Sequence, residues 1–145
     1  MEKRVKTGIP GLDPLLNGGL LSGRSVLLSG PCGSGKSIFA MQYIYSGVTK
    51  FNEPGLYVSF EEERERIIEN MAALGFDLKK LAKTKKFILI GGALGNLGGF
   101  MEKVGAETDH IIDEIAEVVN EHNIKRVVID SVSLFSLLSK DIEER

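Results

Sequence analysis

The stretch that most constrains the fold is Gly-Pro-Cys-Gly-Ser-Gly-Lys-Ser at positions 30–37, which satisfies the pattern G-x-x-x-x-G-K-[S/T]. Its glycines let the backbone curl so that successive N–H groups point inward and form a nest for an anion. A helix that starts at the nest adds about half a positive charge through its dipole. A phosphate-binding loop of this kind requires a strand before it and a helix after it, so the motif predicts an α/β fold. The alternative is a glycine turn with an exposed lysine.

The flanking segments favour the phosphate loop. "RSVLLSG" at 24–30 is a short apolar run bounded by glycines and predicts a buried strand. "KSIFAMQYIYSG" at 36–47 is apolar nearly all round and predicts a buried helix that ends at Gly47. We therefore predict that the whole loop binds the phosphates of a nucleotide, through Gly30, Pro31, Cys32, Gly33, Ser34, Gly35, Lys36 and Ser37.

The rest of the chain repeats the alternation of strands and helices. Short apolar runs at 55–60, 85–90 and 126–130 predict further buried strands. Two helices with one apolar stripe each are predicted between them, with the stripes Ile67, Ile68, Met71 and Leu74, and Ile111, Ile112, Ile115, Val118 and Val119. Right-handed crossovers wind this order into a three-layer α/β/α sandwich with a mainly parallel sheet. At 145 residues, a single domain is expected.

The residue types in and near the loop predict a magnesium-dependent site. Lys36 can reach the β- and γ-phosphates, and Ser37 can offer its hydroxyl to Mg²⁺. A second metal anchor is normally an Asp at the end of a neighbouring aliphatic strand, and Asp130 stands at the end of the run at 126–130. The alternative for Asp130 is a cap on the segment that follows the strand.

Hydrolysis also needs a group that orients and deprotonates water, and Ser131 replaces the glutamate that often follows the strand Asp. Glu61, Glu62 and Glu63 follow the strand at 55–60, and ligands of α/β sheets gather at such strand ends. Ser59-x-x-Glu62 is also a capping-box pattern, so these acids can stabilise a helix start instead. The two roles are compatible, and both stay open at this point.

The composition of the chain limits which binding partners and which cellular compartment are expected. With 18 basic and 20 acidic residues the net charge is −2, which gives no bulk attraction to nucleic acid or to anionic membranes. Cys32 is the only cysteine, which fits a reducing compartment. The sequence shows neither a signal peptide nor an apolar run long enough to span a membrane. A cytoplasmic location is therefore expected. The glycine-rich stretch at 91–105 lacks the G-x-G-x-x-G spacing and predicts a mobile surface loop or a second phosphate or nucleic-acid loop.

Several blocks in a fixed order give the sequence a family resemblance. "TGIPGLDPLLNGGLLSGRSVLLSGPCGSGKS" at 7–37 resembles the opening of RecA-superfamily domains and, more narrowly, of KaiC-like ATPases, and "SFEE", "ALGFDLKKL" and "RVVIDS" resemble later blocks. The resemblance covers about residues 7–133 and implies a RecA-like P-loop core that binds ATP with Mg²⁺. It implies catalytic roles for Lys36, Glu61 and Glu62, metal binding by Ser37 and Asp130, and homo-oligomeric rings, commonly hexamers, with ATP at subunit interfaces.

Domains of this family continue beyond the point matched by Arg145, so residues 1–145 are expected to be the N-terminal portion of one domain that lacks the C-terminal strands. The leading hypothesis is an ATPase active in its complete or oligomeric form. The alternatives are a nucleotide-binding module without turnover, a RecA/RadA-type DNA-dependent ATPase and a small-molecule kinase. The stretch at 131–145 holds no aromatic-basic cluster, which gives a DNA role little support. A small-molecule kinase would carry an Arg-rich lid, and the sequence shows no such segment.

Overall fold

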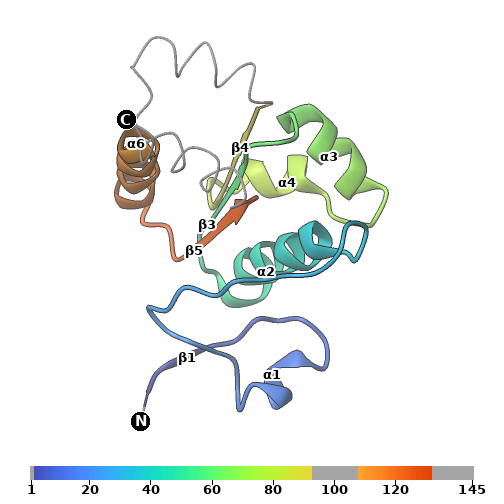
Figure 1. Ribbon diagram of the computed structural model, residues 1–145, viewed down its shortest axis with the longest axis vertical. Coiled ribbons are helices and arrows are strands. Elements are labelled where there is room, and N and C mark those ends of the chain that lie inside the picture. The colour runs from blue at the N-terminus through green and yellow to red at the C-terminus, as the bar shows by residue number, and fades with distance from the viewer. Residues whose placement is uncertain (1, 93–107, 132–145) are drawn as a thin grey trace, which may run out of the picture.

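A parallel sheet of β3 (Gly55–Ser59), β4 (Phe87–Gly91) and β5 (Arg126–Asp130) lies at the centre of the computed structural model, which describes residues 2–92 and 108–131 (Figure 1). Its order is β4-β3-β5, and the register pairs Ser59 with Asp130. Since all three strands run in the same direction, their carboxyl ends share one edge of the sheet. That edge is where an α/β sheet places its ligands.

Helices cover both faces of this sheet (Figure 1). The chain moves from β3 to β4 through α3 (Arg64–Ala72) and α4 (Leu78–Lys83), and returns from β4 to β5 through α6 (Thr108–Glu121). Right-handed crossovers in opposite directions along a sheet place their helices on opposite faces. The long helix α2 (Lys36–Phe51) packs on the same face as α3 and α4. The predicted α/β/α sandwich is confirmed.

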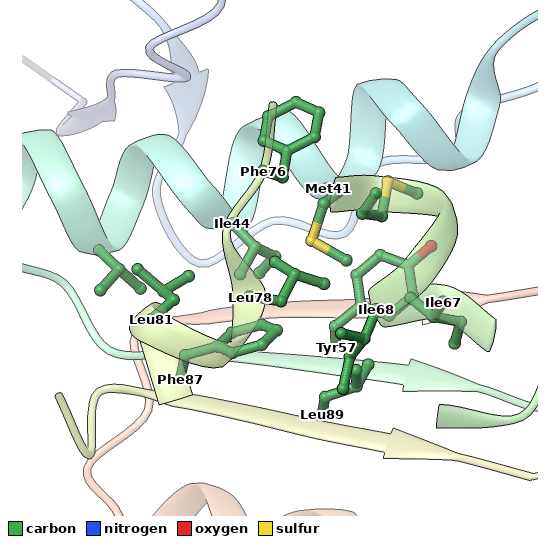
Figure 2. Close-up of a cluster of buried hydrophobic side chains, with 12 residues drawn as sticks. Met41, Ile44, Tyr57, Ile67, Ile68, Phe76, Leu78, Leu81, Phe87 and Leu89 are labelled. Atoms are coloured by element: carbon green, nitrogen blue, oxygen red, sulfur yellow. The ribbon is translucent and has the colours of Figure 1, made fainter. Parts of the chain in front are cut away.

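Alternate residues of β3 supply the two cores, as expected for a strand with both faces buried. Tyr57 points to the face under α2, α3 and α4, where it joins Met41, Ile44 and other apolar side chains (Figure 2). Leu56 and Val58 point to the opposite face, where α6 packs with Ile115, Val118 and Val119. The central strand is thus held between two apolar layers, which fixes the position of its carboxyl end.

Helix α2 differs from its prediction at both ends. It continues past Gly47 to Phe51 and ends at Asn52, which has a left-handed φ of 56°. The N–H of the next residue, Glu53, donates to the Gly47 carbonyl oxygen at 2.9 Å. Gly47 is therefore inside the helix, and the reason for a glycine there is close packing, because a Cβ atom would lie 2.4 Å from Arg126 Cδ. At the other end Ile38 and Phe39 are exposed, so the first turn is not buried.

The predicted helix faces are only partly correct. In α3, Ile67, Ile68 and Met71 are buried as predicted, but the helix ends at Ala72 and Leu74 is 52% exposed. The chain turns away at Gly75, whose φ of 91° favours glycine. In α6, Ile112 is also 52% exposed, whereas the side chain of Ile111 is outside the described residues.

The largest disagreement with the sequence analysis concerns residues 24–30. This apolar run was expected to be a buried strand, but it forms no part of either described sheet, and Val26 and Leu27 are 61% and 77% exposed. A strand needs a hydrogen-bonded neighbour as well as a suitable composition. Within the described sheet β5 pairs with β3 alone, so the prediction of a strand at 24–30, made from composition, is wrong.

A short N-terminal unit precedes this segment. It consists of β1 (Arg4–Val5), α1 (Leu12–Leu15) and β2 (Leu20–Leu21), and β1 pairs with β2 in antiparallel fashion. None of these three elements was predicted. Asp13 ties it together, because its carboxylate accepts the Thr7 N–H (2.8 Å), the Thr7 hydroxyl (2.6 Å) and the Gly8 N–H (3.2 Å). Desolvation acts to raise the pKa of Asp13, but these hydrogen bonds together outweigh it and hold the pKa below its ordinary value.

Arg126, the first residue of β5, joins this unit to the sandwich. Its side chain is 1% exposed, and its Nε lies 2.6 Å from Glu53 Oε2. Its terminal nitrogens donate to the carbonyl oxygens of Lys6 (2.7 Å), Thr7 (3.4 Å) and Tyr43 (3.1 Å). The guanidinium also stacks on the Tyr43 ring at 4.6 Å from its centroid. A buried charge is stable only with such partners, so Arg126 fixes three separate segments to the start of β5.

Candidate nucleotide site

A polar cleft of about 290 Å³ opens at the carboxyl ends of β3 and β5. It is lined by Ser37, Ser59, Glu61, Glu62, Arg66 and Asp130. These residues come from the start of α2, the ends of two adjacent strands, the segment after β3 and the first turn of α3. Four of the sequence-predicted residues, Ser37, Glu61, Glu62 and Asp130, therefore meet in one place.

The closest link across the cleft joins Ser37 and Asp130, which are 93 positions apart in the chain. The Ser37 hydroxyl donates to Asp130 Oδ2 at 2.6 Å. Tyr57, on β3, donates its hydroxyl to the same oxygen at 2.7 Å. Burial, followed by the hydrogen bond to the Asp130 carboxylate, raises the pKa of Tyr57 far above its ordinary value, so the phenol remains a donor.

The glycine loop leads into α2 as predicted. Gly33 and Gly35 have left-handed φ values of 78° and 91°, which glycine adopts without strain, and Gly35 is the N-cap residue of α2. The N–H groups of the first helical turn have no partner within the helix, so they can bind an anion. Lys36 Nζ donates to the carbonyl oxygens of Gly30 (2.8 Å) and Pro31 (2.9 Å), which holds the ammonium against the loop.

Most of the loop lies on the surface beside the cleft. Residues 30–34 are exposed, including the free thiol of Cys32, and Ser37 is the one loop residue that lines the cleft. A phosphate chain bound along the loop would thus reach the cleft through the Ser37 end.

The glutamates precede the helix rather than opening it, because α3 begins at Arg64 and its N-cap residue is Glu63. The predicted local bond is present: the Glu62 N–H donates to Ser59 Oγ at 3.2 Å. It forms a turn between β3 and α3, so helix capping does not account for Glu61 and Glu62. Both line the cleft.

Glu62 is held in place by two residues of α3. Asn70 Nδ2 donates to Glu62 Oε1 at 2.7 Å, and Arg66 Nε lies 3.7 Å from the same oxygen. Glu61 is exposed, whereas Glu62 is partly buried. The two acids therefore differ in how firmly the protein orients them.

Sequence reasoning missed Tyr57, Arg66 and Asn70. The spacing of Arg66 from Glu62, four positions, and the helical stripe of α3 could have suggested that Arg66 and Asn70 lie on one side of the helix. Tyr57 gave no signal of its own, because its contact with Asp130 depends on the register of β3 against β5, and register is not evident in either strand alone.

The donor set suits Mg²⁺ better than a metal that needs several protein ligands. Over residues 2–92 and 108–131, no group of three or more His, Cys, Asp and Glu side chains is placed to hold a metal ion. Mg²⁺ is commonly bound through one carboxylate, a hydroxyl and the substrate's own phosphates, and the hydrogen-bonded pair of Ser37 and Asp130 could offer a hydroxyl and a carboxylate of this kind. In the same part of the chain, none of the helices is long and apolar enough to traverse a bilayer.

Comparison with known proteins decides the family. The family described as "ATPase: KaiC" matches residues 5–145. The chain belongs to the KaiC ATPase family. Its core is that of a RecA-like P-loop ATPase, as the sequence blocks predicted.

Two relatives and one solved structure resemble at least 90% of the chain. A UPF0273 protein of Methanocaldococcus jannaschii is 42% identical over 137 residues, which are 90% of this chain and 57% of the relative. A circadian clock oscillator protein KaiC of Prochlorococcus marinus is 36% identical over 133 residues, 90% of this chain and 26% of that protein. The crystal structure of a KaiC-like protein of Pyrococcus horikoshii matches with a TM-score of 0.80 and 36% identity, over 94% of this chain and 57% of that one. The chain thus spans little more than half the length of the UPF0273 relative.

Proposed function

We propose that this chain forms the nucleotide-binding half of an ATPase site, which holds Mg-ATP between the loop at 30–37 and the ends of β3 and β5. The observation that carries the proposal is the 2.6 Å hydrogen bond between Ser37 and Asp130. It joins the loop to the strand end and brings together the hydroxyl and the carboxylate that would hold a Mg²⁺ ion beside the phosphates. When bound, Mg²⁺ would supply charge neutralisation for those phosphates.

The loop would bind the phosphates through its backbone and through Lys36. The N–H groups at the start of α2 and the left-handed glycines 33 and 35 suit an anion. Lys36 would exchange its two carbonyl partners for phosphate oxygens, which are stronger acceptors for an ammonium group. The side chain of Cys32 is exposed beside the loop and needs no chemical role.

We propose further that the site hydrolyses ATP, with Glu62 as the main candidate for the group that orients water and Glu61 as the second. Glu62 lines the cleft with Asp130 and is oriented by Asn70 and Arg66. A positioned carboxylate at hydrogen-bond distance from water contributes typically 10²–10⁴-fold to a rate. Turnover would occur in a homo-oligomer, such as a ring, in which a neighbouring subunit completes the charge stabilisation around the phosphates.

The test is a steady-state ATPase assay combined with nucleotide binding, for the wild type and for single variants Lys36→Ala, Glu61→Gln and Glu62→Gln. We expect Lys36→Ala to weaken Mg-ATP binding at least tenfold, because it removes the one side-chain cation of the loop. We expect Glu62→Gln to keep binding within about twofold and to lower the rate at least 10²-fold, with a smaller loss for Glu61→Gln.

The results also separate the alternatives. Tight binding with no phosphate release, in the oligomer as well as in the monomer, would indicate a nucleotide-binding module without turnover. A rate that rises only when single-stranded DNA is added, and falls steeply with salt, would indicate a DNA-dependent ATPase. Equal nucleotide affinity in the wild type and Lys36→Ala would contradict the proposed site altogether.

A further inference from the structure

Tyr57 is the residue whose position the proposed ATPase chemistry leaves unexplained. It lies in the middle of β3 and is 1% exposed, and its ring packs among Met41, Ile67 and the other side chains of the core (Figure 2). A phenylalanine would fill the same space without bringing a hydroxyl into the core. A buried hydroxyl costs free energy unless it is hydrogen-bonded, and the hydroxyl of Tyr57 is bonded to Asp130.

The strand register explains how Tyr57 reaches Asp130. Ser59 pairs with Asp130, and Tyr57 stands two positions before Ser59, so it lies on the same face of the sheet and diagonally across from Asp130. Diagonal neighbours on adjacent strands are within reach of long aromatic side chains. The contact is therefore built from two strands of the rigid sheet.

The two donors to Asp130 differ in what supports them. Ser37 belongs to the loop and the first turn of α2, where the next two residues, Ile38 and Phe39, are exposed. Tyr57, by contrast, is fixed inside the core. Both hydroxyls donate to the same carboxylate oxygen, Asp130 Oδ2. If the Ser37 hydroxyl turns to Mg²⁺, as the proposed function requires, Tyr57 still holds the carboxylate.

We infer that Tyr57 is a positioning residue for the metal site: its hydroxyl fixes the orientation of the Asp130 carboxylate, so that Asp130 remains aimed at the metal when Ser37 changes partners. Tyr57 acts through Asp130 and touches neither nucleotide nor metal. The inference rests on the proposed Mg-nucleotide site. Groups that orient a metal ligand typically contribute 10- to 100-fold to metal affinity.

The test uses Mn²⁺ as the probe, titrated in the presence of ADP and followed by electron paramagnetic resonance of the free ion. Tyr57→Phe removes only the hydroxyl, and we expect about tenfold weaker Mn²⁺ binding, the lower end of the range for such groups. ADP affinity measured in EDTA should stay within about twofold of the wild type, because the loop is untouched. Tyr45→Phe is the matched control: it removes the same hydroxyl from a ring that packs edge-on against Phe76, at 5.2 Å between centroids.

A double-mutant cycle tests whether the effect passes through Asp130. In an Asp130→Asn background, adding Tyr57→Phe should weaken Mn²⁺ binding by less than about twofold, because coupled residues are not additive. The inference is wrong if Tyr57→Phe binds Mn²⁺ as tightly as the wild type, or if it weakens metal-free ADP binding equally. A wild type that binds neither Mn·ADP nor ADP would instead refute the proposed function on which the inference rests.

Discussion

The two ends of β5 carry opposite charges and serve different purposes. At its start, Arg126 is buried and bonded to Glu53 and to three backbone carbonyl oxygens, all of which belong to the permanent structure of the fold. At its end, Asp130 is partly buried and accepts bonds from two hydroxyls at the wall of a cleft. The partners of the Arg126 charge are fixed parts of the fold, whereas the Asp130 charge has at least one partner, the Ser37 hydroxyl, that can change its hydrogen bond.

The difference shows how a single five-residue strand separates stability from binding. Partners of Arg126 come from the N-terminal unit, from α2 and from the segment before β3, so losing the guanidinium would loosen all three. Partners of Asp130 are side-chain hydroxyls, which exchange hydrogen bonds at low cost. Substitutions at the amino end of β5 should therefore change stability, and substitutions at its carboxyl end should change ligand binding.

The largest expected effect follows from Arg126→Met. It leaves the Glu53 carboxylate and three carbonyl oxygens without their donor, and we expect the free energy of unfolding to fall by about 3 kcal/mol, because removing one partner of a buried ion pair typically costs 3–5 kcal/mol and Glu53 is partly exposed. Urea denaturation followed by circular dichroism measures the change.

The opposite end of the strand provides the comparison for that experiment. Asp130→Asn keeps the shape of the side chain and an acceptor oxygen, so we expect unfolding to change by less than about 1 kcal/mol while Mn²⁺ binding falls. Arg66→Met controls for removing an exposed guanidinium from the surface. A loss of stability as large for Asp130→Asn as for Arg126→Met would remove the distinction between the two ends.

A smaller effect is expected from Gly47→Ala, and its sign is informative. Alanine is favoured over glycine inside a helix by about 1 kcal/mol, yet here a Cβ atom would lie 2.4 Å from Arg126 Cδ. Because Arg126 is fixed by its partners and overpacking typically costs 1–3 kcal/mol, we expect a net loss of about 1 kcal/mol. In an Arg126→Ala background the same substitution should become stabilising. If Gly47→Ala stabilises the otherwise wild-type protein, Arg126 is less rigidly held than its contacts indicate.

The smallest effect concerns Asp13 and appears only as a function of pH. Its pKa is lowered in the folded protein, so its contribution to stability is present above its unfolded value of 3.8 and is lost as the pH falls through the folded value. Asp13→Asn should lower the melting temperature by about 2–4 °C at about pH 6. That difference should shrink below about pH 4. Calorimetry across this range checks the prediction, and a difference that is constant with pH would show that the Asp13 charge is unimportant.

Much of the site was predictable because its residues occupy positions that chemistry restricts. A loop that holds phosphates needs glycines, and a metal anchor needs an acid at a strand end, so Ser37 and Asp130 could be paired across 93 positions before any contact was known. The fold followed for the same reason, since apolar runs that alternate with striped helices have few three-dimensional solutions.

The errors have a common physical origin in tertiary contacts. The run at 24–30 has the composition of a strand, but composition supplies no neighbour. Gly47 looked like a helix end, and the glycine is required instead by the approach of Arg126 from a distant part of the chain. Tyr57 was overlooked because its hydroxyl acts across two strands. The glycine-rich stretch from 93 onward and most of 131–145, where the sequence suggested loops, lie outside the described residues.

The contacts of Arg126 also determine where a shortened or fused version of this protein must start. Its buried guanidinium donates to the main chain of Lys6 and Thr7, so a protein that begins after Thr7 would retain the charge and lose two of its acceptors. A fusion partner joined ahead of Lys6 keeps them. Lys6 and Thr7 therefore belong to the folding unit, even though they contribute no strand to its central sheet.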